Sequence, residues 1–350
     1  MTDIIESIVK NYKFNLNNYQ KNYQSRHWFY NNNKKKILFD NIKLKDFRKN
    51  DLSKGMDDTF YTKKQAKELY KIVQEECGRV FVHSLLLKKN IGNSKKFIKD
   101  GHYYFTAHEL FHIKFVYDIK QKIKLKKNDI ICEIGPGYGS MISKLIKLYN
   151  SKVILIDLPE ANFISQYYLQ LQFPQKKFFV SKDIKNNTIT KKDILDNDII
   201  ILCPWDKLPK IKINLFVNTR SMMEMKREII DYYFKLIQDL MRIGGSFLCI
   251  NRYYKDTVGY PIEMNNYPYD KRWKVLTSKP SWMQKRIHFL LTKRIKRKKN
   301  EIHEELKMIE KMSNKSRLED PFFWRRILPN SIYKLYKNIK FFLFLDKINE

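Results

Sequence analysis

Five short apolar runs follow one another from Asp129 onward, and segments of helical length separate them. The runs read DIICEIG, KVILID, DIIILCP, NLFVNT and SFLCIN. Strands that alternate with helices are typical of βαβ units, and uninterrupted apolar runs indicate strands buried on both faces. The pattern predicts an α/β fold with a doubly wound parallel sheet.

Two further strand candidates follow these runs, at Trp273–Thr277 and His288–Thr292, with a polar link between them. A doubly wound sheet that ends in such a pair is expected to insert its last strand antiparallel to the others. We therefore predict one mixed sheet within a domain of residues 121–295, covered by helices on both faces.

The segments on either side of this domain have a different pattern. In residues 1–120, apolar residues recur at intervals of three and four over Lys63–Leu87 and Thr106–Ile123, which predicts helices. We interpret this part as a helical N-terminal region. Residues 296–350 are predicted to form a basic, aromatic helical extension, with a highly charged helix over residues 294–315 at its start.

The formal net charge of +32 is the most unusual property of the composition. Clusters such as Lys34–Lys36 and Lys293–Lys299 suggest binding to nucleic acid, anionic lipid or phosphorylated substrates. Lysine is also frequent in ordinary loops throughout the chain, so a solvated basic surface explains the charge equally well. The charge alone therefore leaves these alternatives open.

The four cysteines, Cys77, Cys132, Cys203 and Cys249, lie far apart, and the last three fall in strand candidates. This is the pattern of small buried side chains in a reducing compartment, and it predicts neither a disulfide framework nor a zinc site. The chain has no charged start followed by an apolar stretch and no apolar run of about 18 residues. We expect a cytoplasmic protein that does not span a membrane.

The C-terminal stretch FFWRRILPNSIYKLYKNIKFFLFL interleaves aromatic and basic residues. Such a stretch can lie in an anionic membrane interface, and one interpretation is therefore peripheral contact with the inner face of a membrane. The alternative is a helix docked on the preceding domain by its apolar face. Pro329 would interrupt a long continuous helix in either case.

The first strand candidate ends in glycines and runs directly into a predicted helix, in DIICEIGPGYGSMISKLIKLY. Gly135, Gly137 and Gly139 are expected to form the tight turn, and the helix is expected to begin near Ser140. Glycines let the backbone approach a ligand closely, and the unpaired N–H groups of the helix start can bind it. The turn is therefore a candidate ligand-binding loop.

The second strand candidate ends in Asp157, followed by Leu158. A carboxylate at that position can accept hydrogen bonds from both ribose hydroxyls of an adenosine. The dinucleotide pattern G-x-G-x-x-G would need glycine where Ser140 stands. The acid Glu133 also disfavours a nearby pyrophosphate and tolerates a cationic sulfonium. We therefore predict S-adenosyl-L-methionine, not NAD, as the cofactor in contact with this loop, Asp157 and Leu158.

The sequence resembles a family of bacterial sugar O-methyltransferases found among glycan-assembly enzymes. EIGPGYG is shared by many methyltransferases, whereas NTRSMMEM is more specific to this family. The resemblance covers about residues 45 to 295. The stretches that carry it are FRKNDLSKGMDD at 47–58, EIGPGYG at 133–139, NLFVNTRSMMEM at 214–225, INRYY at 250–254 and YPYDKRW at 267–273.

The resemblance implies the Rossmann-like fold of class I methyltransferases, S-adenosyl-L-methionine as the methyl donor, and a hydroxyl group of a sugar or glycan precursor as the acceptor. The N-terminal region 1–120 would form the lid on the acceptor side. Position by position, the resemblance assigns Glu133, Gly135, Gly137, Gly139 and Asp157 to the cofactor. It assigns Asn218, Ser221 and Glu224 to the mouth of the site, where we expect Asn218 to contact the cofactor and Ser221 the substrate.

Methyl transfer to a hydroxyl group needs an aligned acceptor and a base that takes its proton. Glu224, beyond the carboxyl end of the predicted strand NLFVNT, is one candidate base. The alternative is an acid that complements a helix N-terminus. His112, on the helix before the first strand, is a second candidate catalytic residue, although a partly buried structural histidine is common. Arg252 and Tyr253 are expected to bind acceptor phosphate or sugar.

HELFH at 108–112 matches H-E-x-x-H, which on a helix would place His108 and His112 on one face for zinc. No GxxH continuation follows, and the acid at a suitable distance, Glu133, belongs to the glycine loop. We therefore predict no metal.

Two other functions remain open. The charge favours an RNA methyltransferase, but no RNA-binding module and no Asn/Asp-Pro-Pro-Tyr motif is present, so nucleic acid is not the expected partner. A non-catalytic basic adaptor on a methyltransferase scaffold is the other alternative, and the intact glycine loop with Asp157 is evidence against it.

Overall fold

The computed structural model describes residues 2–35, 44–53, 61–185, 188–282, 284, 286–319, 328–329 and 331–332. Most of the aromatic and basic stretch at residues 322–345 lies outside these residues, so its predicted membrane contact stays a prediction. Part of the stretch at 47–58 lies outside them as well. In the described part of the chain, no helix is long and apolar enough to cross a membrane.

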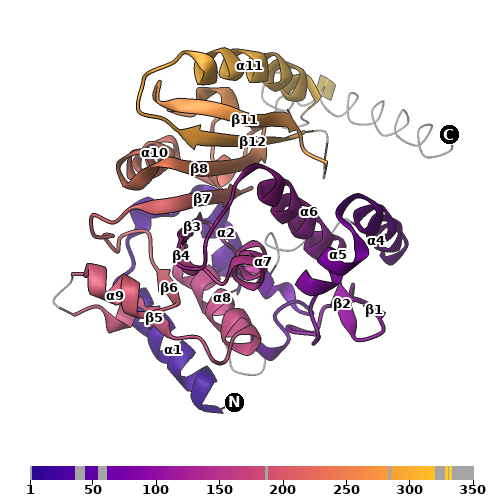
Figure 1. Cartoon of the computed structure of the whole chain (residues 1–350), viewed down its shortest axis with the longest axis vertical. Coiled ribbons are helices and arrows are strands. Elements are labelled where there is room, and N and C mark those ends of the chain that lie inside the picture. Colours follow the sequence, from indigo (N-terminus) through magenta and orange to yellow (C-terminus); the bar gives the residue numbers. More distant parts are fainter. Residues whose placement is uncertain are drawn as a thin grey trace.

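An eight-stranded mixed sheet forms the centre of the protein, in the order β11-β12-β8-β7-β3-β4-β6-β5 (Figure 1). The strands β3 to β8 pair in parallel, whereas β12 runs antiparallel between β8 and β11. Their bounds are β3 (Ile130–Ile134), β4 (Lys152–Ile156), β5 (Phe178–Val180), β6 (Ile199–Leu202), β7 (Ile213–Thr219), β8 (Met241–Arg252), β11 (Trp273–Pro280) and β12 (Ile287–Arg294).

The strand order confirms the predicted α/β fold, with the five apolar runs as β3, β4, β6, β7 and β8. The antiparallel insertion of β12 confirms the expected ending of the sheet. The edge strand β5 was not predicted, because its three residues are too short to show a pattern. This sheet is that of the Rossmann-like class I methyltransferases, with β5 added at one edge.

Ten described helices surround the sheet. They are α1 (Thr2–Asn17), α2 (Arg26–Lys35), α4 (Lys63–Cys77), α5 (Arg79–Leu85), α6 (Ala107–Lys122), α7 (Ser140–Tyr149), α8 (Pro159–Gln172), α9 (Lys191–Asp196), α10 (Arg227–Leu240) and α11 (Glu301–Glu319). Short 3₁₀ turns include η1 (Lys21–Tyr23), η3 (Asp51–Ser53), η4 (Ser181–Asp183), η5 (Met222–Glu224) and η6 (Met264–Asn266). Two small hairpins pair β1 (Ile98–Asp100) with β2 (Tyr103–Phe105) and β9 (Tyr254–Lys255) with β10 (Ile262–Glu263).

The helices cover the two faces of the sheet in separate groups. Ile131 of β3 packs in the core that α6, α7 and α8 complete, whereas its neighbour Cys132 packs in the core of α10 and α11. Successive side chains of a strand point to opposite faces, so an apolar run such as IICEI requires helices on both. All four cysteines are free and buried, as the sequence predicted.

The helices outside the sheet domain differ from the prediction at their ends. The helix expected over Lys63–Leu87 is interrupted at Gly78, whose φ of +86° lies outside the helical region and separates α4 from α5. Thr106 caps α6 through its hydroxyl, as its position before the helix suggests. The charged helix was expected from residue 294, but α11 begins at Glu301 because β12 continues to Arg294.

The N-terminal helix α1 packs on α8, next to the sheet domain (Figure 1). The rings of Tyr12 and Phe163 lie 4.8 Å apart between centroids. The side-chain amide of Asn11 donates a hydrogen bond of 3.0 Å to Gln166. The N-terminal segment is therefore attached to the sheet domain at α8, and the chain continues from α1 into η1 and α2.

Candidate active site

The glycine loop joins β3 to α7 and depends on backbone conformations that favour glycine. Gly135, Gly137 and Gly139 have φ angles of +69°, +60° and +90°. A Cβ atom added at Gly135 would lie 2.1 Å from the hydroxyl oxygen of Ser221. Gly139 precedes the first residue of α7, Ser140. Ser221 therefore packs closely against one side of the loop, and Gly135 and Gly137 line a cavity.

Asp157, at the end of β4, contacts this loop directly. One carboxylate oxygen accepts a hydrogen bond of 3.0 Å from the backbone N–H of Gly137, and the other accepts one of 2.8 Å from Leu158. Burial raises the pKa of Asp157 to about 7, and the two N–H donors oppose that rise. The predicted convergence of the glycine loop and this carboxylate is thus present.

A cavity of about 970 Å³, its open mouth included, lies above the carboxyl ends of β3, β4 and β7. This volume is in the range of small-molecule sites. Open α/β sheets bind ligands at this edge. The predicted residues that line it are Gly135, Gly137, Asp157, Leu158, Ser221, Glu224 and His112.

Three predicted cofactor residues do not belong to the described lining of the cavity. Glu133 is fully buried, accepts a hydrogen bond of 3.2 Å from Thr219, and has a pKa that burial raises to about 8. Gly139 packs on Leu169. Asn218 is fully buried, and its amide donates to the backbone carbonyl of Ile134 at 2.8 Å. These residues hold the loop from behind.

The structure does not bring Tyr253 to the cavity either. Its side chain is buried in the core, and its hydroxyl lies 2.9 Å from Nδ1 of His288 on β12. Arg252 is also absent from the described lining, and its backbone N–H donates to the sulfur of Met223. Arg252 is the last residue of β8 and Tyr253 follows it, one strand beyond β7, and this position at a strand end does not bring either residue to the cavity.

Glu224 lines the cavity as an ion-paired carboxylate. It contacts the ammonium group of Lys255, and its other oxygen lies 3.6 Å from Nε2 of His27. Burial by itself would raise the pKa of Glu224, but Lys255 and His27 outweigh it and lower this pKa. The carboxylate is therefore charged at neutral pH and bound to two partners from distant segments.

His108 and His112 both line the cavity from α6, and their ring centroids lie 4.2 Å apart. Burial lowers the pKa of His108 to about 3 and lowers that of His112 well below its usual value. The Nδ1 atoms of both rings are buried without a hydrogen-bond partner. Both imidazoles are therefore neutral at physiological pH, and each retains a nitrogen that can accept a hydrogen bond or a proton.

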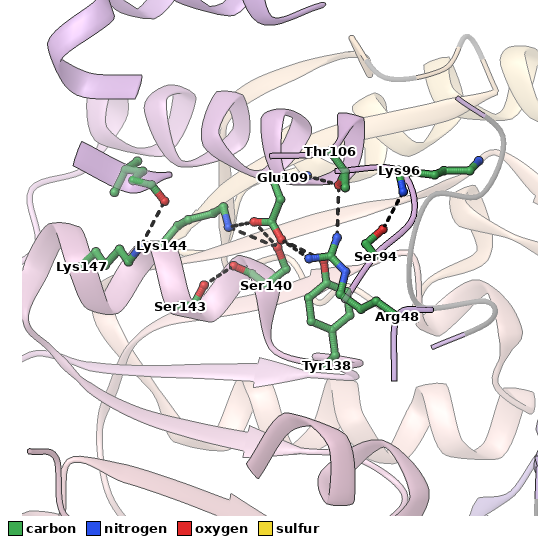
Figure 2. A network of polar contacts seen from close by, with 11 residues as sticks. Arg48, Ser94, Lys96, Thr106, Glu109, Tyr138, Ser140, Ser143, Lys144 and Lys147 are labelled. Atoms are coloured by element: carbon green, nitrogen blue, oxygen red, sulfur yellow. Dashed lines mark hydrogen bonds and ion pairs between the residues drawn. The ribbon is translucent and has the colours of Figure 1, made fainter. Parts of the chain in front are cut away.

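Glu109, between these two histidines in sequence, is not part of the described cavity lining and belongs to a buried network (Figure 2). It contacts the ammonium group of Lys144 and lies 3.1 Å from a guanidinium nitrogen of Arg48. The hydroxyls of Tyr138 and Ser140 also donate to it, at 3.1 and 3.2 Å. This carboxylate is fully committed to structural partners, so it is not the base of a metalloprotease.

The zinc alternative finds no further support. Among the residues that the structure describes, no three His, Cys, Asp or Glu side chains gather as metal ligands. The motif HELFH instead has two roles: its histidines line the cavity, and its glutamate joins α6 to the glycine loop.

Sequence reasoning assigned residues 1–120 to the acceptor side of the site but named none of the first 40 residues that line the cavity. The lining includes Tyr23 of η1, Ser25 between η1 and α2, and Trp28 and Asn32 of α2. The sequence contains one pattern that could have predicted this contribution, because the polar and aromatic residues at positions 25, 28 and 32 are spaced to share one face of a helix. The lysine- and asparagine-rich surroundings concealed that face.

No family model and no curated protein matches this chain. Solved structures with a similar fold include mitomycin 7-O-methyltransferase, at 12% identity over 54% of this chain and 57% of that chain, with a TM-score of 0.33. Geranyl diphosphate C-methyltransferase from Streptomyces coelicolor A3(2) has 13% identity over 54% of this chain and 81% of that chain, with a TM-score of 0.37. An rRNA methylase from Streptococcus thermophilus has 12% identity over 49% and 90%, with a TM-score of 0.33.

The chain spans little more than half the length of the mitomycin enzyme. Likeness at this level extends to the fold alone, and the strand order with its antiparallel β12 defines that fold independently. The chain has the Rossmann-like fold of class I methyltransferases, with its cavity at the edge of the sheet where such folds bind ligands.

Proposed function

We propose that this protein is an S-adenosyl-L-methionine-dependent methyltransferase. The observation that carries the proposal is the convergence of the glycine loop and Asp157 on one open cavity. The residues present fit an adenosyl ligand: Asp157 offers a carboxylate to ribose hydroxyls, and Gly135 and Gly137 leave no side chain in the space beside it. Glu133 lies behind the loop, where its charge would complement a cation.

When bound, this cofactor supplies a methyl group whose bond to the sulfonium sulfur breaks, with the electron pair left on sulfur, as the bond to an acceptor oxygen forms. The chain must then align the acceptor and receive its proton. His112 is placed to receive the proton, because it lines the cavity and its Nδ1 is buried without a hydrogen-bond partner; the burial that lowers its pKa keeps the imidazole unprotonated but makes it a weaker base. Glu224 is already charged and paired with Lys255, so it is better suited to hold an acceptor hydroxyl in place.

We further propose that the acceptor is a hydroxyl group of a sugar or glycan precursor. Ser221, Glu224 and the two histidines give the cavity several hydrogen-bonding groups, and Trp28 gives it an aromatic face. Sugars present hydroxyls at their edges and C–H groups on their faces, so a lining of this kind suits them. The N-terminal region would cover this side of the cavity as a lid.

The first test is calorimetric titration of S-adenosyl-L-methionine into the protein and into the Gly137→Arg variant. We expect saturable binding by the natural protein and none by the variant, because the long side chain would enter the cavity. Absence of binding by both proteins would refute the proposal and leave the non-catalytic adaptor.

The acceptor is tested by incubation with the methyl donor and a panel of nucleotide sugars and glycan fragments, with mass detection of an added methyl group. Salt-dependent retention on RNA, compared with retention on acidic vesicles, tests the remaining partners. Methylation of RNA and of no sugar would replace the proposed acceptor while leaving the methyl donor in place.

A further inference from the structure

Helix α2 turns one face into the cavity and the other to solvent. Ser25, just before the helix, and Trp28 and Asn32 within it belong to the cavity lining and follow one another at intervals of three and four residues. Phe29 and Tyr30, between them in sequence, are about half exposed. Because side chains at such intervals share one side of a helix, the inward face of α2 is a wall of the cavity.

The segment that carries this face contacts residues that follow β6 and β7. The ring of Tyr23 lies 6.1 Å from that of Trp205, which follows β6. His27 lies 3.6 Å from Glu224, which follows β7. The side chain of Lys226 also bonds to the backbone carbonyl of Asn22 at 3.3 Å. The start of α2 is therefore held on the β7 side, where Glu224 and Ser221 line the same cavity.

Three buried polar side chains in the described lining contain an atom without a hydrogen-bond partner. They are Asn32, through Oδ1, and His108 and His112, through Nδ1. Asn32 is 3% exposed, so water does not readily reach that oxygen. A buried polar group without a hydrogen-bond partner destabilises the folded state, and native structures retain few such groups without a reason. A ligand that donates hydrogen bonds would supply such a reason.

Resting on the proposed function, we propose that Trp28, Asn32, His108 and His112 form the acceptor subsite, and that its occupant is the uncharged, hydroxyl-rich ring of a sugar residue. The ring donates hydroxyl hydrogens to Asn32 and to the imidazoles, and places its C–H face on Trp28. None of these four side chains carries a charge at neutral pH, so the subsite selects by hydrogen bonding and shape. Any phosphate or lipid on the acceptor lies outside this part of the cavity.

The test uses the full chain and a panel of methyl hexopyranosides with their monodeoxy analogues, in the presence of S-adenosyl-L-homocysteine. Ligand-detected NMR measures binding of each sugar, and calorimetry measures binding of S-adenosyl-L-methionine in parallel. We expect at least one methyl hexopyranoside to bind the natural protein, and one of its monodeoxy analogues to bind about tenfold more weakly, as loss of one hydrogen bond to a buried partner predicts.

The variant Asn32→Leu keeps the size of the side chain and removes its hydrogen bonds. We expect it to weaken sugar binding about tenfold and to leave cofactor affinity within about twofold of the natural protein. Asn32→Asp keeps an accepting oxygen and should retain more sugar binding than Asn32→Leu. Phe29→Leu, on the exposed face of the same helix, is the matched control and should match the natural protein in both measurements.

Several outcomes would overturn the subsite. It is wrong if no hexopyranoside binds while S-adenosyl-L-methionine does, a result that leaves the methyl donor standing. It is also wrong if Asn32→Leu loses cofactor and sugar affinity equally, because the α2 face would then belong to the cofactor site. If Asn32→Leu does not fold, Trp28→Leu and Asn32→Asp decide by the same two measurements. Failure of the natural protein to bind S-adenosyl-L-methionine would instead refute the proposed function.

Discussion

Replacing Glu109 by glutamine tests the buried network behind the glycine loop. The substitution keeps the shape of the side chain and removes its charge. It would leave the Arg48 guanidinium and the Lys144 ammonium group, both fully buried, without the carboxylate that pairs them. The same carboxylate accepts hydrogen bonds from Tyr138 of the glycine loop and Ser140 of α7. Both stability and the shape of the loop should therefore respond.

The expected size follows from the burial of all three charged groups. Removing one partner of a buried ion pair costs about 3–5 kcal/mol, because the remaining charge is left without compensation. Burial already lowers the pKa of Lys144, so this lysine can lose its proton and reduce the penalty toward the lower figure. The unfolding entropy is about 2.1 cal/mol/K per residue, and the chain has 350 residues. A loss of about 3–5 kcal/mol in the free energy of unfolding therefore corresponds to a fall in Tm of roughly 4–7 °C.

Thermal unfolding followed by circular dichroism measures that fall, and calorimetry with S-adenosyl-L-methionine measures the effect on the loop. The double variant Glu109→Gln with Lys144→Met removes one charge of each sign and should recover about half of the lost stability. Lys192, which pairs with Asp196 on the exposed surface, provides the control, since Lys192→Met should change Tm little. A Tm of Glu109→Gln within about 1 °C of the natural protein would show that the network does not carry the charges described.

Three further results are expected. Gly135→Ala should abolish cofactor binding in a calorimetric titration, because the new Cβ atom would lie 2.1 Å from the hydroxyl oxygen of Ser221. Gly101→Ala is the control and should bind the cofactor normally, because no atom lies within 4 Å of its Cβ position. Burial raises the pKa of Asp157 to about 7 and that of Glu133 to about 8, so a bound cation should expel protons from these carboxyl groups. S-adenosyl-L-methionine should therefore bind more tightly at pH 8 than at pH 6, and calorimetry in buffers of different ionisation enthalpy should detect the released protons. S-adenosyl-L-homocysteine, which lacks the sulfonium, should release fewer protons. Burial lowers the pKa of His108 to about 3, so below about pH 6.5 the imidazole of His108 gains a proton in the unfolded chain but not in the folded protein. The free energy of unfolding should therefore fall as the pH falls toward 4. Urea titrations of the His108→Gln variant should show a smaller loss of stability over the same pH range.

The sequence alone determined the sheet domain and its glycine loop. Each apolar run needs two covered faces, and that requirement is local to the run. The glycines at 135, 137 and 139 occupy left-handed conformations that the turn demands, and Asp157 lies next to them because parallel strands end at one edge. These features depend on neighbours in sequence or on a fixed strand geometry. A strand of three residues such as β5 has too little pattern to be predicted in this way.

Only the tertiary structure decided which polar side chains face the cavity. The sequence predicted Asn218 as a cofactor ligand, but its side-chain amide donates a hydrogen bond to the backbone carbonyl of Ile134 on β3. Glu109 lies between two histidines that line the cavity, but Arg48, 61 positions away, and Lys144 hold its carboxylate in a buried network. Trp28 joined the cavity because α2 folds back over the strand ends. A side chain takes its role from the groups that surround it, and in this protein those groups come from segments whose separation the order of residues does not reveal.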